Sequence, residues 1–198
     1  MDKGGNLEIL AYNIVARLYL FGKTIDEIEA QLTPISPRCK LIATGEMLLF
    51  LLHHIDRLAY QKDTPSEMRT TIRTEIVANL IEKEIFHPKV TLKLMEDGIK
   101  PSLDAFGTSR STAVKVLLPS FLKEVAEADT DYSSCTEFIG KSPHDEDGLI
   151  NKLSGRILHR WEPEGNILWR FFIITSASDI LLESELAKQD NEALNMLR

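Results

Sequence analysis

Apolar residues recur at helical spacing along most of this chain. They lie three or four positions apart, as one face of an α-helix requires. The pattern predicts helices over residues 6–21, 24–32, 38–61, 66–87, 111–128 and 144–161, with a last long helix from about residue 167. We therefore expect an all-α or α-dominated chain, with residues 1–198 forming a single-domain helical bundle of about six to seven helices.

Local signals set the expected helix ends. Gly22 follows an apolar stretch and is typical of a helix C-terminus, and Thr24-Ile25-Asp26-Glu27 resembles a capping box that begins a new helix. The stretch TPISP at residues 33–37 separates this short helix from the next one. Pro119 is expected to bend or interrupt the helix that begins near Ser111.

Residues 88–110 fit two different structures. Val90, Leu92 and Leu94 alternate as in a strand and precede the turn pair Asp97-Gly98, which favours a small β-hairpin near residues 90–103. A short helix from Pro88 to Gly98 fits the same residues about as well.

Composition narrows the class of protein. The net charge of −7 disfavours broad contact with nucleic acid or an anionic membrane. The most apolar windows contain several charged residues, so the sequence predicts no membrane span. Two cysteines in unrelated contexts and a start without a signal-peptide pattern favour reduced thiols and a cytoplasmic location.

The segment LLFLLHHIDRLAYQ, residues 48–61, places two histidines and an Asp-Arg pair inside an apolar run. On a helical wheel Glu46, His53 and Arg57 fall within about 40° of one another. His53, Asp56, Arg57 and Tyr60 thus form one polar stripe, in which His53–Asp56 and Asp56–Tyr60 are spaced for hydrogen bonds along the helix. We expect this stripe to face water or another helix.

A second polar anomaly comes from the segment Glu84-Ile-Phe-His87. Glu84 and His87 project from the same helix face as the apolar residues before them. This Glu-x-x-His spacing resembles, over these residues alone, the motif of di-iron carboxylate bundles, which need two such motifs and two further glutamates. With Glu46 and His53 from the neighbouring helix, Glu84 and His87 are candidate ligands for a divalent transition metal. The alternative is a carboxylate that reaches water or pairs with an arginine.

Residues 102–116, SLDAFGTSRSTAVKV, resemble the turn and recognition helix of helix-turn-helix repressors. Gly107 would form the turn, and Arg110 lies at the start of the second helix. Pro101 and Thr108 depart from the pattern, and an ordinary helix after a Gly-Thr-Ser turn explains the same residues.

The last long helix is apolar on almost every side over residues 167–174, which is typical of a bundle centre or a subunit interface. Residues 186–198 form an amphipathic C-terminal tail that could pack on a partner subunit. We therefore expect a cytoplasmic helical interaction or regulatory protein without chemistry of its own, with a protein partner or a second copy. The alternatives are a metal-binding bundle protein, which would include an enzyme, and a helix-turn-helix DNA-binding regulator.

Overall fold

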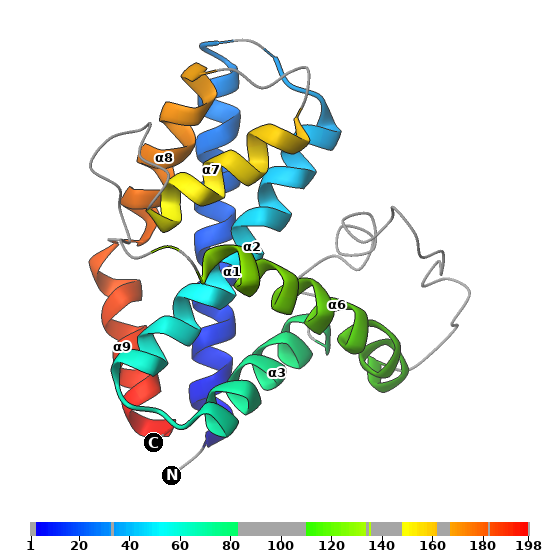
Figure 1. Ribbon diagram of the computed structural model, residues 1–198, viewed down its shortest axis with the longest axis vertical. Helices are drawn as coiled ribbons and strands as arrows, with labels where there is room; N and C mark the ends of the chain where they lie inside the picture. The colour runs from blue at the N-terminus through cyan, green and yellow to red at the C-terminus, as the bar shows by residue number, and fades with distance from the viewer. Residues whose placement is uncertain are drawn as a thin grey trace.

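The computed structural model describes residues 3–32, 34–82, 110–133, 135, 148–161, 167–181 and 183–197. In these residues the backbone forms seven α-helices and no β-strand, so the predicted all-α class and helix number are confirmed there (Figure 1). The helices are α1 (Lys3–Glu29), α2 (Pro37–Gln61), α3 (Ser66–Glu82), α6 (Arg110–Tyr132), α7 (Leu149–Arg160), α8 (Ile167–Leu181) and α9 (Ser184–Leu197). The hairpin expected near residues 90–103 lies outside the described residues.

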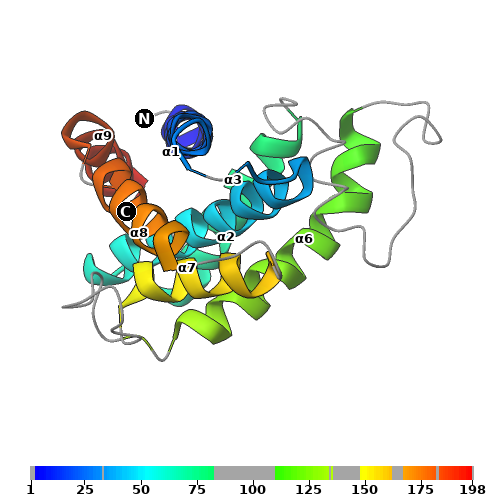
Figure 2. The same cartoon turned by 90° about the horizontal axis from the view of Figure 1, so that it is seen from above.

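Helix α2 is the central helix of the protein. It contacts α1, α3, α6, α7 and α9. Seen from above, it lies between α1 on one side and α6 and α7 on the other (Figure 2). Met47, Phe50, Leu51 and Leu52 are fully buried because helices cover α2 on several sides. The sequence pattern placed the last long helix at a bundle centre or a subunit interface, but the centre is occupied by α2.

The start of α2 follows from a local cap. The Cys39 backbone N–H donates to the Ser36 side-chain oxygen over 3.2 Å, and Pro37 occupies the first turn, where a missing N–H costs nothing. The helix ends at Gln61 and is followed by Asp63, whose φ of 56° reverses the chain toward α3. The predicted bounds of 38–61 are therefore confirmed to within one residue.

Helix α1 corrects the prediction of two separate helices. It continues through Gly22 to Glu29, and the Thr24 hydroxyl donates to the Leu20 carbonyl within the helix instead of capping a new one. Phe21 and Ile25 are both buried on either side of the glycine. Burying these side chains outweighs the roughly 1 kcal/mol that glycine costs inside a helix.

The C-terminal half also differs in detail from the sequence pattern. Helix α6 continues through Pro119 without interruption. Helix α7 begins at Leu149 with Gly148 at its N-cap, and the expected start near residue 144 lies outside the described residues. Helix α9 packs against α1, so Ala193 and Leu194 are buried within the chain itself. Among the described helices, none combines the length and the apolar character that a membrane crossing needs.

Candidate functional site

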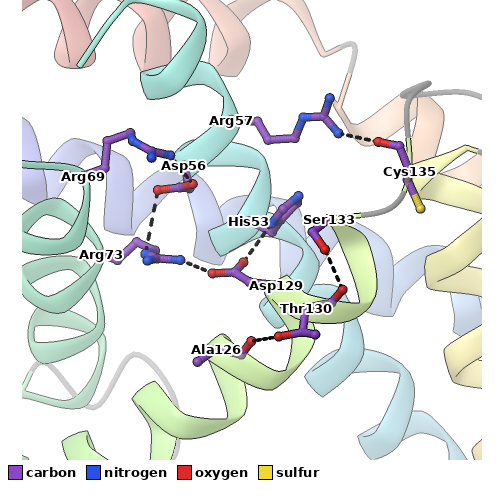
Figure 3. A network of polar contacts seen from close by, with 10 residues as sticks. All are labelled: His53, Asp56, Arg57, Arg69, Arg73, Ala126, Asp129, Thr130, Ser133 and Cys135. Carbon is purple, nitrogen blue, oxygen red and sulfur yellow. Dashed lines mark hydrogen bonds and ion pairs between the residues drawn. The ribbon is translucent and has the colours of Figure 1, made fainter. Parts of the chain in front are cut away.

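The polar stripe of α2 points toward two neighbouring helices. His53 Nδ1 lies 2.7 Å from Asp129 Oδ1 of α6 (Figure 3). The His53 side chain is 9% exposed and that of Asp129 is 23% exposed, so water reaches the edge of this pair. Of the two surroundings expected for the stripe, water or another helix, His53 thus faces another helix.

Two arginines of α3 complete the arrangement. Arg69 Nη1 lies 2.7 Å from Asp56 Oδ2, and Arg73 forms ion pairs with both Asp56 and Asp129 (Figure 3). Cations and anions thus alternate across α2, α3 and α6. We call this set the α2–α3–α6 network; its members are His53, Asp56, Arg69, Arg73 and Asp129.

The remaining residues of the predicted stripe have other roles. Arg57 Nη1 donates to the Cys135 carbonyl oxygen over 3.3 Å. Tyr60 is 65% exposed, with the Arg69 guanidinium 5.2 Å from its ring centre. The spacing allows a hydrogen bond between Asp56 and Tyr60, but Asp56 accepts from Arg69 instead, because a charge-assisted hydrogen bond is stronger than one to a neutral phenol.

Glu46, one helical turn earlier on α2 than Phe50, faces α7 instead. Its side chain is 1% exposed, and its two carboxylate oxygens lie 2.7 Å from Arg156 Nε and 2.6 Å from Arg160 Nη1. Arg156 also pairs with Asp131 of α6. A buried carboxylate needs such compensation, because desolvating it alone costs several kcal/mol.

Tyr132 separates these two sets of ion pairs. Its ring is fully buried, lies 5.2 Å from the His53 ring and 5.7 Å from the Phe50 ring, and has the Arg156 guanidinium 5.6 Å from its centre. Burial raises the pKa of the Tyr132 phenol well above its ordinary value, and nearby carboxylates add to this. Tyr132 therefore stays neutral and acts as an apolar wall between charged groups.

These contacts bear on the candidate metal ligands. Glu46 and His53 are directed to different partners, arginines of α7 and an aspartate of α6, so the structure does not bring them to a common point. Glu84 and His87 lie outside the described residues. Within the part of the chain that is described, no three His, Cys, Asp or Glu side chains converge as a metal site requires. The metal site built on Glu84 and His87 stays a prediction, as does the helix-turn-helix reading of residues 102–116, most of which is likewise not described.

The ion pairs of both sets join one helix to another. In both sets each carboxylate is matched by guanidinium or imidazole groups, and the partners come from different helices. Such pairs fix the packing angle and register of α3, α6 and α7 on α2. The polar stripe of α2 is thus explained by its contacts with the neighbouring helices.

A different surface, which the sequence pattern did not single out, is the outer face of α1. Tyr12 and Tyr19 are 66% and 72% exposed, and Ile9 and Leu20 are also exposed. These four residues follow helical spacing and lie on one side of α1. A groove of about 710 Å³ runs beside them to the start of α9, with Val15, Ala16 and Leu186 on its walls. A second hollow of about 640 Å³ lies between Ile9 of α1 and Ala193 and Met196 toward the other end of α9.

The exposed apolar residues of α1 cannot be told apart, from the sequence alone, from the apolar residues of α1 that pack in the core. Residues 6–21 are apolar on more than one side, and a helical wheel does not say which side a neighbouring helix covers. We call the exposed side the α1 outer face; it consists of Ile9, Tyr12, Val15, Ala16, Tyr19 and Leu20.

Comparison of the chain with protein-family models, with curated proteins and with solved structures finds no match.

Proposed function

We propose that this protein is a helical interaction protein that binds an amphipathic helix of a protein partner along the α1 outer face. The observation that carries the proposal is the pair of solvent-exposed tyrosines, Tyr12 and Tyr19, two turns apart beside an apolar groove. Aromatic side chains on a surface groove are the usual anchors of protein interfaces. A helix laid into a groove between two helices is a common mode of recognition.

The dimensions of the face suit a short helix. Ile9 and Leu20 are separated by about 16 Å along α1 at 1.5 Å per residue, which matches roughly three turns of a bound helix. Leu186 and Ala193 of α9 form the opposite wall, and Met196 extends the apolar surface at the far end. A partner helix with apolar residues at every third or fourth position would cover this strip.

Charge indicates what kind of helix would bind. The rims of the two hollows carry Glu183, Glu185 and Glu192, and the chain as a whole is acidic at −7. Lysine or arginine beside the apolar stripe of the partner would complement this rim and would speed association at low salt. We therefore infer a partner helix that is amphipathic and basic.

The cysteines support the expected compartment. Cys39 and Cys135 are both buried, and they are not joined to each other in a disulfide. Thiols of this kind are typical of a reducing compartment, which agrees with the cytoplasmic location proposed for this interaction protein.

The proposal can be tested with a display library of helical peptides that carry an apolar stripe flanked by lysine and arginine. Selected peptides are measured by fluorescence anisotropy against the wild type and the Tyr12→Ser/Tyr19→Ser variant. We expect about 30-fold weaker binding to the variant, because two interface aromatics contribute about 1 kcal/mol or more each. Raising the salt to about 0.5 M is expected to weaken binding to the wild type as the acidic rim is screened.

Tyr60→Ser is the matched control, since Tyr60 is 65% exposed but lies on α2. It is expected to bind the peptides as the wild type does. A library that yields no binder, or binders that ignore the Tyr12→Ser/Tyr19→Ser change, would overturn the proposal. Light scattering supplies another decisive outcome: a dimer that this double variant abolishes would assign the face to a second copy of the chain instead.

A further inference from the structure

A polar cavity lies on the opposite layer of the molecule from the α1 outer face. It has a volume of about 300 Å³ and is bordered by α7, α8 and α6. Helix α7 lies on the side of α2 away from α1 (Figure 2). The lining includes Lys152, Gly155, Arg156 and His159 of α7, with Arg170 of α8 and Asp131 of α6.

One face of α7 supplies most of the cavity wall. Lys152, Gly155, Arg156 and His159 follow one another at intervals of three, one and three residues, which places them on a single side of the helix. The other side is apolar and buried, with Leu149, Leu153 and Ile157 in the core. The core therefore holds this helix in place while its polar face lines the cavity.

The cavity carries an excess of positive charge. Lys152, Arg156 and Arg170 are cations at neutral pH, and Asp131 is the one carboxylate in the lining. Arg156 is already paired with Asp131 and Glu46. Within the described residues, no ion pair joins Lys152 or Arg170 to a carboxylate, whereas Arg156 and Arg160 are both paired.

Arg170 adds an unsatisfied donor. Its Nε is buried and has no hydrogen-bond partner among the described residues. A buried donor without a partner costs about 1–3 kcal/mol, so native proteins rarely keep one without a ligand or water to accept its hydrogen bond. An anionic oxygen in the cavity would satisfy this group.

Gly155 faces the open space of the cavity. A Cβ atom placed at this position would meet no other atom within 4 Å. Glycine is otherwise a poor choice inside a helix, where it costs about 1 kcal/mol relative to alanine. The absence of a side chain here leaves room for a small ligand between Lys152 and Arg170.

From this geometry we propose that the cavity binds a phosphate monoester group. Lys152 and Arg170 contact the phosphate oxygens, since guanidinium and ammonium groups are the usual phosphate ligands in proteins. Arg156, fixed by Glu46 and Asp131, provides a stationary positive charge at the back of the cavity. The group is carried either by a soluble metabolite or by a lipid headgroup, because both present the same phosphate chemistry.

The first test uses inorganic phosphate and glycerol phosphate at constant ionic strength, with chloride as the reference anion. Isothermal titration calorimetry is expected to show binding to the wild type and at least about 10-fold weaker binding to Lys152→Gln/Arg170→Gln, as expected for the loss of charge-assisted hydrogen bonds. Lys188→Gln is the matched control, because it removes one exposed lysine from α9. Equal loss in the control, or no binding of either phosphate by the wild type, would overturn the proposal.

A second variant tests whether phosphate binding needs the space inside the cavity or only the positive charge around it. Gly155→Leu places a side chain into the open space and changes no charge. It is expected to fold, as checked by circular dichroism, and to abolish phosphate binding. Undiminished binding to this variant would contradict the proposed site.

The source of the phosphate is assigned by co-sedimentation with vesicles of phosphatidylcholine containing phosphatidic acid. Tighter binding of glycerol phosphate than of vesicles indicates a soluble ligand, whereas tighter binding of vesicles indicates a headgroup. The Tyr12→Ser/Tyr19→Ser variant is expected to bind phosphate as the wild type does, so this inference and the proposed peptide binding can fail separately.

Discussion

The neighbouring histidines of α2 lie in two very different regions. His53 belongs to the α2–α3–α6 network, where its partner Asp129 is 23% exposed. His54 is buried where the charge of Arg17 helps to lower its pKa, in a region that we call the dry α1–α9 junction and that comprises Asn13, Arg17, His54 and Asp190. Both regions contain ion pairs, but only the first is open to water.

The charges of the dry junction are shielded from bulk solvent. Arg17 Nη1 lies 2.7 Å from Asp190 Oδ2, and the side chains of both residues are fully buried. Asn13 Nδ2 donates to the other oxygen of Asp190 over 2.9 Å. Burial raises the pKa of the Asp190 carboxyl, while the Arg17 charge and the hydrogen bond from Asn13 oppose this rise.

In these two regions we expect solvent access, more than the type of pair, to decide how much an ion pair contributes to the free energy of unfolding. In the α2–α3–α6 network a lost partner can be replaced by water or by another member of the network. In the dry junction it cannot, because an unpaired buried charge keeps its full desolvation cost. Three predictions test this difference, and they are ordered by the size of the expected effect.

Arg17→Met should give the largest loss of stability. It leaves the Asp190 carboxylate buried without its cation, which is expected to reduce the free energy of unfolding by about 3–5 kcal/mol. Urea unfolding followed by circular dichroism measures this loss. Adding Asp190→Leu removes the stranded charge, so the double variant should return to within about 1–2 kcal/mol of the wild type. A single variant as stable as the wild type would show that the junction is not dry.

Acid should destabilise the protein through His54. Burial, with the Arg17 charge adding to it, lowers the pKa of His54 from 6.5 to about 3 in the folded state. Between these two pH values His54 is protonated in the unfolded chain but neutral in the folded chain. The contribution of neutral His54 to stability is therefore complete above pH 6.5 and decreases as the pH falls toward 3. Between pH 7.5 and pH 4.5 the expected loss is about 2–3 kcal/mol.

The measurement is urea unfolding of the wild type and of His54→Gln across this pH range. The glutamine variant should lack this part of the acid-induced loss, since its side chain does not titrate. His53→Gln retains His54 and should keep it. Parallel pH profiles for the wild type and His54→Gln would refute the assignment.

Asp129→Asn should cause a smaller loss. The change removes the anion shared by His53 and Arg73; Arg73, at 23% exposure, can still be solvated, whereas His53 is largely buried. We expect about 1–2 kcal/mol, decreasing at high salt. Asp179→Asn, on the exposed side of α8, is the control and should change stability by less than about 0.5 kcal/mol. A loss at Asp129 as large as that of Arg17→Met would remove the distinction between the two regions.

The helices themselves could largely be predicted from the sequence, because their signals are local. The Ser36 cap and Pro37 defined the start of α2, and helical periodicity gave its length. Gly22 misled the prediction for α1, because the burial of Phe21 and Ile25 depends on helices far away in the sequence. Tertiary packing outweighed the local signal there.

The sites were less predictable for the same physical reason. Glu46 and His53 were recognised as unusual residues, but their partners Arg156 and Asp129 lie 110 and 76 residues further along the chain. The Arg17–Asp190 pair could not be predicted, because a helical wheel shows which residues share a face but not which helix packs against that face. Likewise, the α1 outer face can be identified only from the packing of α2, α3, α8 and α9 on the other sides of α1.

The Arg17–Asp190 contact has a consequence for how the protein is made. The two residues are 173 positions apart, so Arg17 is synthesised well before the residue that supplies its counter-ion. Before Asp190 is in place, burying Arg17 would carry the full desolvation cost of its guanidinium charge. Docking of α9 on α1 supplies the Asp190 carboxylate, so we expect the burial of Arg17 to accompany that docking.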